Sequence, residues 1–96
     1  MLTGKQKRFL RKHAHHLTPV FQIGKNGLNE NMIEQIDETL EKREVIKVSV
    51  LQNNFESKED LAEQIANGTD SYIVQIIGNV IILYRESNEY KQIDLP

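Results

Sequence analysis

The chain has 96 residues, enough for one small domain with a single hydrophobic core, and we expect residues 1–96 to form that one domain. Cysteine is absent, which excludes disulfides, thiol nucleophiles and thiolate metal sites. The net charge of −2 conceals an asymmetry, because residues 1–29 carry only cations whereas acids outnumber cations in residues 30–96. One end of the molecule should therefore attract polyanions.

The first expected element is a basic amphipathic helix. Thr3 and Gln6 have the spacing of a capping box, and a helix can run from there to about His15 or His16 before Pro19 forces extended chain. At helical spacing the apolar residues gather on one face, which predicts that this face packs on the core. The opposite arc is cationic and holds Lys5, Lys7, Arg8, Arg11 and Lys12.

A glycine-bounded loop follows a short expected strand over residues 19–23 and precedes a second helix. The loop residues are Gly24, Lys25, Asn26 and Gly27. Without Cβ atoms the two glycines can take positive φ and expose backbone N–H groups, and the N-terminus of the next helix adds partial positive charge. This combination suits phosphate and is similar to the Gly-x-x-Gly clamp of KH-type nucleic-acid modules. An ordinary strand-to-helix turn is the alternative.

The second helix should begin after a cap at Asn29 and bury a narrow seam of Ile33, Ile36 and Leu40. Its outer face is acidic, and we expect that face to be solvated surface. The acidic residues are Glu34, Glu38 and Glu41. Residues 44–51 then alternate between two faces, which predicts a strand with at least one packed face.

The remaining chain predicts one helix and a hairpin. The helix is capped by Ser57 and should stop at Gly68. Two β-rich runs, residues 72–77 and 80–84, flank a glycine-asparagine turn, and residues 86–96 are expected to form a surface tail. The predicted order is α-β-α-β-α-β-β, an α/β sandwich with a mixed four-stranded sheet and packed helices.

Five short motifs are spread over nearly the whole chain. They are Leu2-Thr3-Gly4-Lys5-Gln6-Lys7-Arg8, Ala14-His15-His16-Leu17 followed by Pro19, Ile23-Gly24-Lys25-Asn26-Gly27-Leu28, Ile46-Lys47-Val48, and Ile77-Gly78 with Leu83-Tyr84-Arg85. Together they resemble the CRM domain, the module named after chloroplast RNA splicing and ribosome maturation, in its stand-alone bacterial YhbY-like form.

The resemblance implies an RNA-binding protein without catalytic activity that associates with precursors of the large ribosomal subunit. It also implies a fold resembling the C-terminal domain of translation initiation factor 3, with residues 24–27 in contact with RNA.

A metal site is the first competing interpretation, because His13, His15 and His16 are close in sequence. These histidines fall on different arcs of the helix, and no cysteine or carboxylate lies nearby to complete a ligand shell. His13 then packs at the core edge, while the other two bind phosphate or cap the helix end. The chain also lacks a nucleophile elbow, a phosphate-loop motif and a dinucleotide fingerprint, so we expect neither enzymatic activity nor a cofactor.

We therefore predict an RNA surface made by the glycine loop and the cationic arc of the first helix, with one further cation at the end of the last strand. The predicted contacts are Lys5, Lys7, Arg8, Arg11, Lys12, Gly24, Lys25, Asn26, Gly27 and Arg85. Lys47 either extends this surface or is simply solvated.

The expected partner is RNA, specifically ribosomal RNA in a precursor of the large subunit. We expect a cytoplasmic monomer without membrane contact, because no export signal is visible and the longest apolar run is too short to span a bilayer. The alternative function is a protein adaptor that uses the acidic helix face and the tail.

Overall fold

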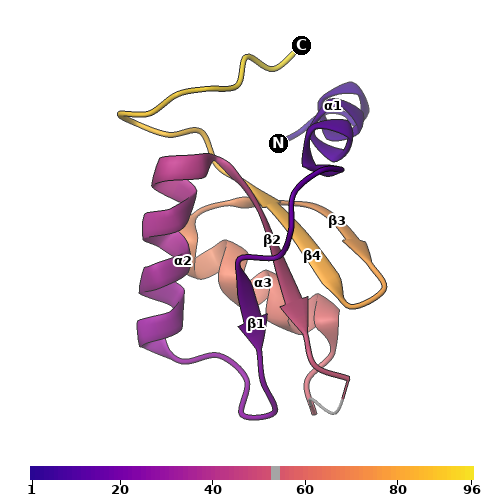
Figure 1. Cartoon of the computed structure of the whole chain (residues 1–96), viewed down its shortest axis with the longest axis vertical. Coiled ribbons are helices and arrows are strands. Elements are labelled where there is room, and N and C mark those ends of the chain that lie inside the picture. Colours follow the sequence, from indigo (N-terminus) through magenta and orange to yellow (C-terminus); the bar gives the residue numbers. More distant parts are fainter. Residues whose placement is uncertain (53–54) are drawn as a thin grey trace.

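The computed structural model describes residues 1–52 and 55–96, and the elements in this part of the chain follow the predicted order (Figure 1). They are α1 (Gly4–Ala14), β1 (Phe21–Ile23), α2 (Glu30–Arg43), β2 (Val45–Val50), α3 (Lys58–Thr69), β3 (Tyr72–Ile77) and β4 (Val80–Tyr84). The predicted α/β alternation with a terminal hairpin is thus confirmed.

In the described residues the strands form one four-stranded sheet in the order β1-β2-β4-β3. β1 and β2 are parallel and are connected through α2, whereas β4 is antiparallel to both of its neighbours. The sheet is therefore mixed, as predicted, because a helical crossover joins the parallel pair and a tight turn joins the antiparallel pair β3 and β4.

Helices cover both faces of the sheet, so the molecule has three layers (Figure 1). On one face, α2 and α3 bury the larger apolar cluster, in which Ile36 and Leu61 pack with strand residues such as Val48. On the other face, Leu10 and Ala14 of α1 pack in a second cluster. Its strand members are Val45, Val74, Ile82 and Tyr84. The part of this face around Ser49, Val80 and Ile77 lies outside the cluster and is partly exposed.

The helix starts agree with the caps read from the sequence. The Thr3 capping box is complete, and the side chains of Asn29 and Ser57 each accept a hydrogen bond from the backbone N–H three residues ahead. Local side-chain chemistry sets these ends, which is why a sequence pattern predicts them. α1 is slightly shorter than expected and ends at Ala14, and β1 begins at Phe21 rather than at residue 19.

The prediction that α3 stops at Gly68 is wrong. The helix continues to Thr69 and ends with Asp70 in the left-handed conformation. A Cβ at Gly68 would lie 2.8 Å from Ile33 Cγ2, so the glycine lets α3 approach α2 closely instead of ending the helix.

The prediction of a surface tail over residues 86–96 is also wrong, because this segment is anchored by two glutamates of α2 and its C-cap. Glu44 is fully buried, and its carboxylate accepts backbone hydrogen bonds from Ser87 (2.7 Å), Gln92 (2.6 Å) and Ile93 (2.9 Å). Ile93 is itself buried in the same apolar cluster as α1. The segment therefore belongs to the layer that supports α1.

Glu41, predicted as solvated surface, is the second anchor. Its carboxylate accepts hydrogen bonds from the backbone N–H groups of Asn88 (3.1 Å) and Glu89 (3.0 Å) and from the Ser87 hydroxyl (2.8 Å). The two backbone hydrogen bonds are the main reason why the pKa of Glu41 lies below its ordinary value. The acidic face of α2 is thus partly used inside the molecule.

Candidate nucleic-acid interface

The cationic arc of α1 faces away from the apolar cluster that holds the helix. Lys5, Arg8 and Lys12 are exposed, and Lys7 and Arg11 are partly exposed. Ion pairs in the described residues involve only Arg85 and Lys91 among the cations. The positive charges of α1 are therefore not neutralised by carboxylates of the described chain, and they are available to a polyanion.

The glycine loop is a tight turn at the end of β1. The backbone N–H of Gly27 donates a hydrogen bond to the carbonyl of Gly24 at 3.1 Å, and the side chains of Lys25 and Asn26 between them are exposed. Gly27 has a φ of +76°, as expected for a glycine-dependent turn, whereas Gly24 does not have positive φ. One of the two expected left-handed glycines is therefore present.

The expected contribution of a helix N-terminus to this loop is weaker than predicted. α2 begins at Glu30, after Leu28 and the cap residue Asn29, and the Asn29 side chain already accepts the N–H of Met32 at 2.8 Å. A carboxylate oxygen of Glu56 also lies close to the loop, 2.8 Å from the position that a Cβ on Gly27 would occupy. Positive charge at the loop thus comes from Lys25.

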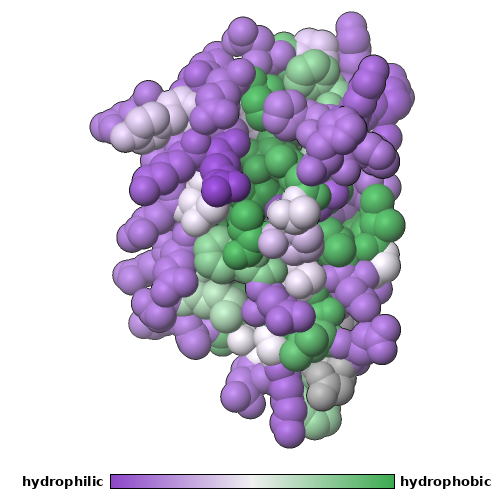
Figure 2. Space-filling view, in the orientation of Figure 1, coloured by the Kyte–Doolittle hydropathy of each residue, from purple (hydrophilic) through white to green (hydrophobic). Residues whose placement is uncertain are grey.

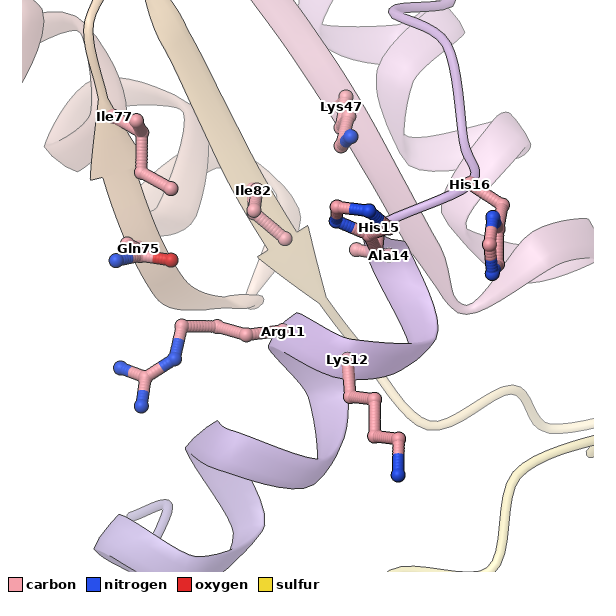
Figure 3. A pocket seen from close by; sticks show the side chains of 9 residues that line it. All are labelled: Arg11, Lys12, Ala14, His15, His16, Lys47, Gln75, Ile77 and Ile82. Atoms are coloured by element: carbon pink, nitrogen blue, oxygen red, sulfur yellow. The ribbon is translucent and has the colours of Figure 1, made fainter.

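A groove lies between the end of α1 and the sheet (Figure 3). Lys47, Ile82 and Gln75 are neighbours in register across β2, β4 and β3 and form its floor. The side chains of α1 and the following turn form its rim. They are Arg11, Lys12, Ala14, His15 and His16. The hollow has a volume of about 480 Å³, and none of its lining residues is acidic.

Lys47 is the residue that the sequence left open, and the structure places it beside α1. Its ammonium group donates a hydrogen bond to the carbonyl of Leu17 at 3.0 Å, which ties β2 to the segment after α1. Figure 3 shows Lys47 and His15 near each other at one side of the groove. Lys47 thus adds positive charge to the groove floor. One of the three N–H donors of its ammonium group is used in the hydrogen bond to Leu17, and within the described residues the other two remain.

The surface between α1 and the glycine loop is the partly exposed end of the sheet. Figure 2 shows an apolar area over the middle of this face, with hydrophilic surface around α1 and at the end where the glycine loop lies. The backbone N–H of Val20 donates a hydrogen bond to the carbonyl of Lys47, so this residue of the groove floor is level with Val20. The loop begins at Gly24, four residues further along the extended chain, which is about 13 Å from Val20. α1 and the glycine loop therefore lie toward opposite ends of the molecule, with the partly exposed part of the sheet between them (Figure 1).

Arg85 is not brought together with the other predicted contacts. Its guanidinium forms an ion pair with the Asp37 carboxylate and donates to the carbonyls of Thr69 (2.7 Å) and Asp37 (2.9 Å). It lines a hollow with Asp37 and Glu41, among acidic residues. Strand-end position alone suggested exposure, whereas the packing of α2 against the sheet supplies carboxylate partners for this arginine.

The three histidines lie in the last turn of α1 and directly after the helix. His15 and His16 have ring centroids 5.3 Å apart, and His13 is exposed rather than packed at the core edge. In residues 1–52 and 55–96 the structure has no group of three or more His, Cys, Asp or Glu side chains placed to hold a metal ion. Within the same residues, no helix is long and apolar enough to cross a membrane.

The chain belongs to the CRS1/YhbY (CRM) domain family, whose model matches residues 2–85. It is 67% identical over 96 residues to the probable RNA-binding protein YqeI of Bacillus subtilis, with full coverage of both chains. It is 43% identical to an RNA-binding protein of Haemophilus influenzae, covering 99% of this chain and 95% of that protein. The solution structure of the hypothetical protein SAV1595 from Staphylococcus aureus covers both chains fully, with 64% identity and a TM-score of 0.84.

Proposed function

We propose that this chain is an RNA-binding protein that grips the RNA backbone with the α1 cations and the glycine loop, and that it associates with precursors of the large ribosomal subunit. The observation that carries RNA binding is the exposed cationic arc of α1, which no carboxylate of the described chain neutralises. The names of the relatives in Bacillus subtilis and Haemophilus influenzae support it. Phosphate contacts of this kind position RNA without reading its sequence.

The ribosomal part of the proposal rests on the family, which is named after chloroplast RNA splicing and ribosome maturation. A small binding module acts by holding a partner, and ribosomal RNA is an abundant polyanion with an ordered assembly pathway. We expect loss of the protein to slow maturation of the large subunit, most visibly in the cold, where misfolded RNA escapes slowly.

Gradient fractionation of growing cells tests this function directly. At low salt the protein should sediment with precursors of the large subunit rather than with mature ribosomes, and it should move to the top of the gradient at high salt because its phosphate contacts are salt-dependent. Ribonuclease treatment should release it. A protein that stays at the top of the gradient at low salt would contradict the assembly role, and a partner that survives ribonuclease would favour the adaptor function.

Gly27→Val should lower RNA affinity by about tenfold at constant charge. Valine at the φ of +76° is strained, by about 1–2 kcal/mol, and its Cβ would lie 2.8 Å from a Glu56 carboxylate oxygen, so the loop backbone must shift from the conformation that we propose binds phosphate. Fluorescence anisotropy with a labelled single-stranded oligonucleotide measures affinity, and urea unfolding measures the cost in stability.

Gly24→Ala is the matched variant for this test. A Cβ at Gly24 would lie 3.9 Å from Leu51 Cδ1, an ordinary contact, and the residue does not have positive φ, so stability should stay unchanged. A loss of affinity in this variant would show close approach of RNA to the backbone without strain. Unchanged affinity in Gly27→Val would remove the clamp and leave only an electrostatic surface.

A further inference from the structure

A β-bulge in β3 turns Gln75 into the groove. The register moves from Ile73 opposite Leu83 directly to Gln75 opposite Ile82, so that Val74 is the extra residue. Val74 and Ile82 both belong to the cluster beneath α1. In a regular strand Gln75 would face the opposite side from Val74 and enter the core under α2 and α3. The bulge therefore places a polar amide on the α1 side, which is how bulges re-aim side chains at sites.

The Gln75 amide is available to a ligand. Within residues 1–52 and 55–96, its side-chain amide makes no hydrogen bond, although the amide has two donors and an acceptor. Its neighbours in the groove are the apolar side chains of Ile77 and Ile82, and Figure 3 shows Arg11 reaching from α1 toward β3 near Gln75. One amide thus lies between an apolar surface and a cation.

The three groups of this arrangement match the three parts of a nucleotide that a protein can bind. An aliphatic surface fits the flat face of a base, an amide can pair with a base edge, and an arginine can hold the attached phosphate. The hollow of about 480 Å³ is within the size range of small-molecule sites. Its positive charge, without any acidic lining residue, favours a nucleic acid over a basic peptide.

We propose that the groove is a subsite for one unpaired nucleotide of the bound RNA, with the base against Ile77 and Ile82, its edge on Gln75 and its phosphate near Arg11. The base must be unpaired because a paired base offers neither its faces nor its Watson–Crick edge. The inference rests on the proposed function and adds a preference for single-stranded RNA and a source of base discrimination to it. The partly exposed end of the sheet carries the strand onward to the glycine loop.

The experiment compares Gln75→Ala with Gln35→Ala, a control on the exposed face of α2. Fluorescence anisotropy measures the affinity of each protein for labelled RNA strands of twelve nucleotides. The strands are the homopolymers of A, C, G and U, an abasic strand and a duplex. Wild type should prefer one base by about tenfold, and should bind the abasic strand and the duplex about tenfold more weakly than that base. Gln75→Ala should bind all four homopolymers alike, whereas Gln35→Ala should behave as wild type.

Ile77→Ser is a second variant that does not depend on Gln75, because Ile77 is 54% exposed and its replacement should leave the fold intact. It should lose about fivefold in affinity for the preferred homopolymer and nothing for the abasic strand. Wild-type base preference in both variants would overturn the subsite while leaving RNA binding in place. Failure of wild type to bind any of these RNAs at low salt would overturn the proposed function and the subsite together.

Nuclear magnetic resonance distinguishes whether RNA or a protein ligand binds in the groove. The side-chain amide signals of Gln75 should shift on addition of the preferred homopolymer and stay unchanged with an acidic peptide of equal charge. Shifts with the peptide alone would overturn the inference in favour of a protein ligand.

Discussion

Reversing Arg8 and Lys12 together to glutamate should weaken RNA binding on the order of 100-fold at about 0.1 M salt. Two phosphate contacts with a salt slope of about −0.7 each account for roughly 25-fold at that concentration, and the two new negative charges add repulsion. Both side chains are exposed and have no ion-pair partner among the described residues. The free energy of unfolding should therefore change by less than about 0.5 kcal/mol.

A salt series measures this effect. If four to six of the predicted cations contact phosphates, log K against log salt should have a slope of about −3 to −4 for wild type, and the double variant should lose about 1.4 of it. Glu34→Lys with Glu38→Lys changes the same amount of charge on the exposed face of α2 and should leave affinity unchanged or slightly higher. A wild-type slope near zero, or full affinity in the double reversal, would contradict the α1 interface.

Glu44→Ala should destabilise the protein by about 3 kcal/mol, which is large for a glutamate outside any proposed RNA contact. The substitution leaves the backbone N–H groups of Ser87, Gln92 and Ile93 without their acceptor. Glu44 also has a φ of 66°, a conformation that glycine ordinarily takes, so its side-chain contacts hold a strained helix end in place. Urea unfolding gives the change in stability, and amide hydrogen exchange over residues 87–93 shows whether the segment detaches.

Glu44→Ala should also destabilise α1, because Ile93 lies in the same apolar cluster as α1 and the Gln6 side chain donates a hydrogen bond to the Pro96 carbonyl at 3.3 Å. Amide exchange in α1 should accelerate and RNA affinity should fall secondarily. Glu86→Ala, at an exposed residue whose only ion pair in the described chain is with Lys91, is the control and should change neither property. Protected amides over residues 87–93 in Glu44→Ala would show that this carboxylate is not the anchor.

The sequence determined the parts of the fold that depend on neighbouring residues. The caps at Thr3, Asn29 and Ser57 and the β3–β4 turn were predicted because each depends on contacts within a few residues. The seam of α2 was predicted because its apolar residues recur at helical spacing, and Ile36 and Leu40 are buried in the structure. The cations of α1 and the glycine loop could be named for the same reason. Their charge and backbone freedom are properties of the residues themselves, so they needed no knowledge of distant partners.

Only the tertiary structure decided which of these groups share a surface and which are used internally. Arg85 looks like any other strand-end cation until α2 places Asp37 beside it, and residues 86–96 look like a polar tail until Glu41 and Glu44 accept their N–H groups. Gln75 faces the groove through a one-residue bulge that leaves no mark on the sequence pattern. Each of these outcomes depends on partners between seven and 48 residues away, and chain packing brings such partners together while local propensity does not.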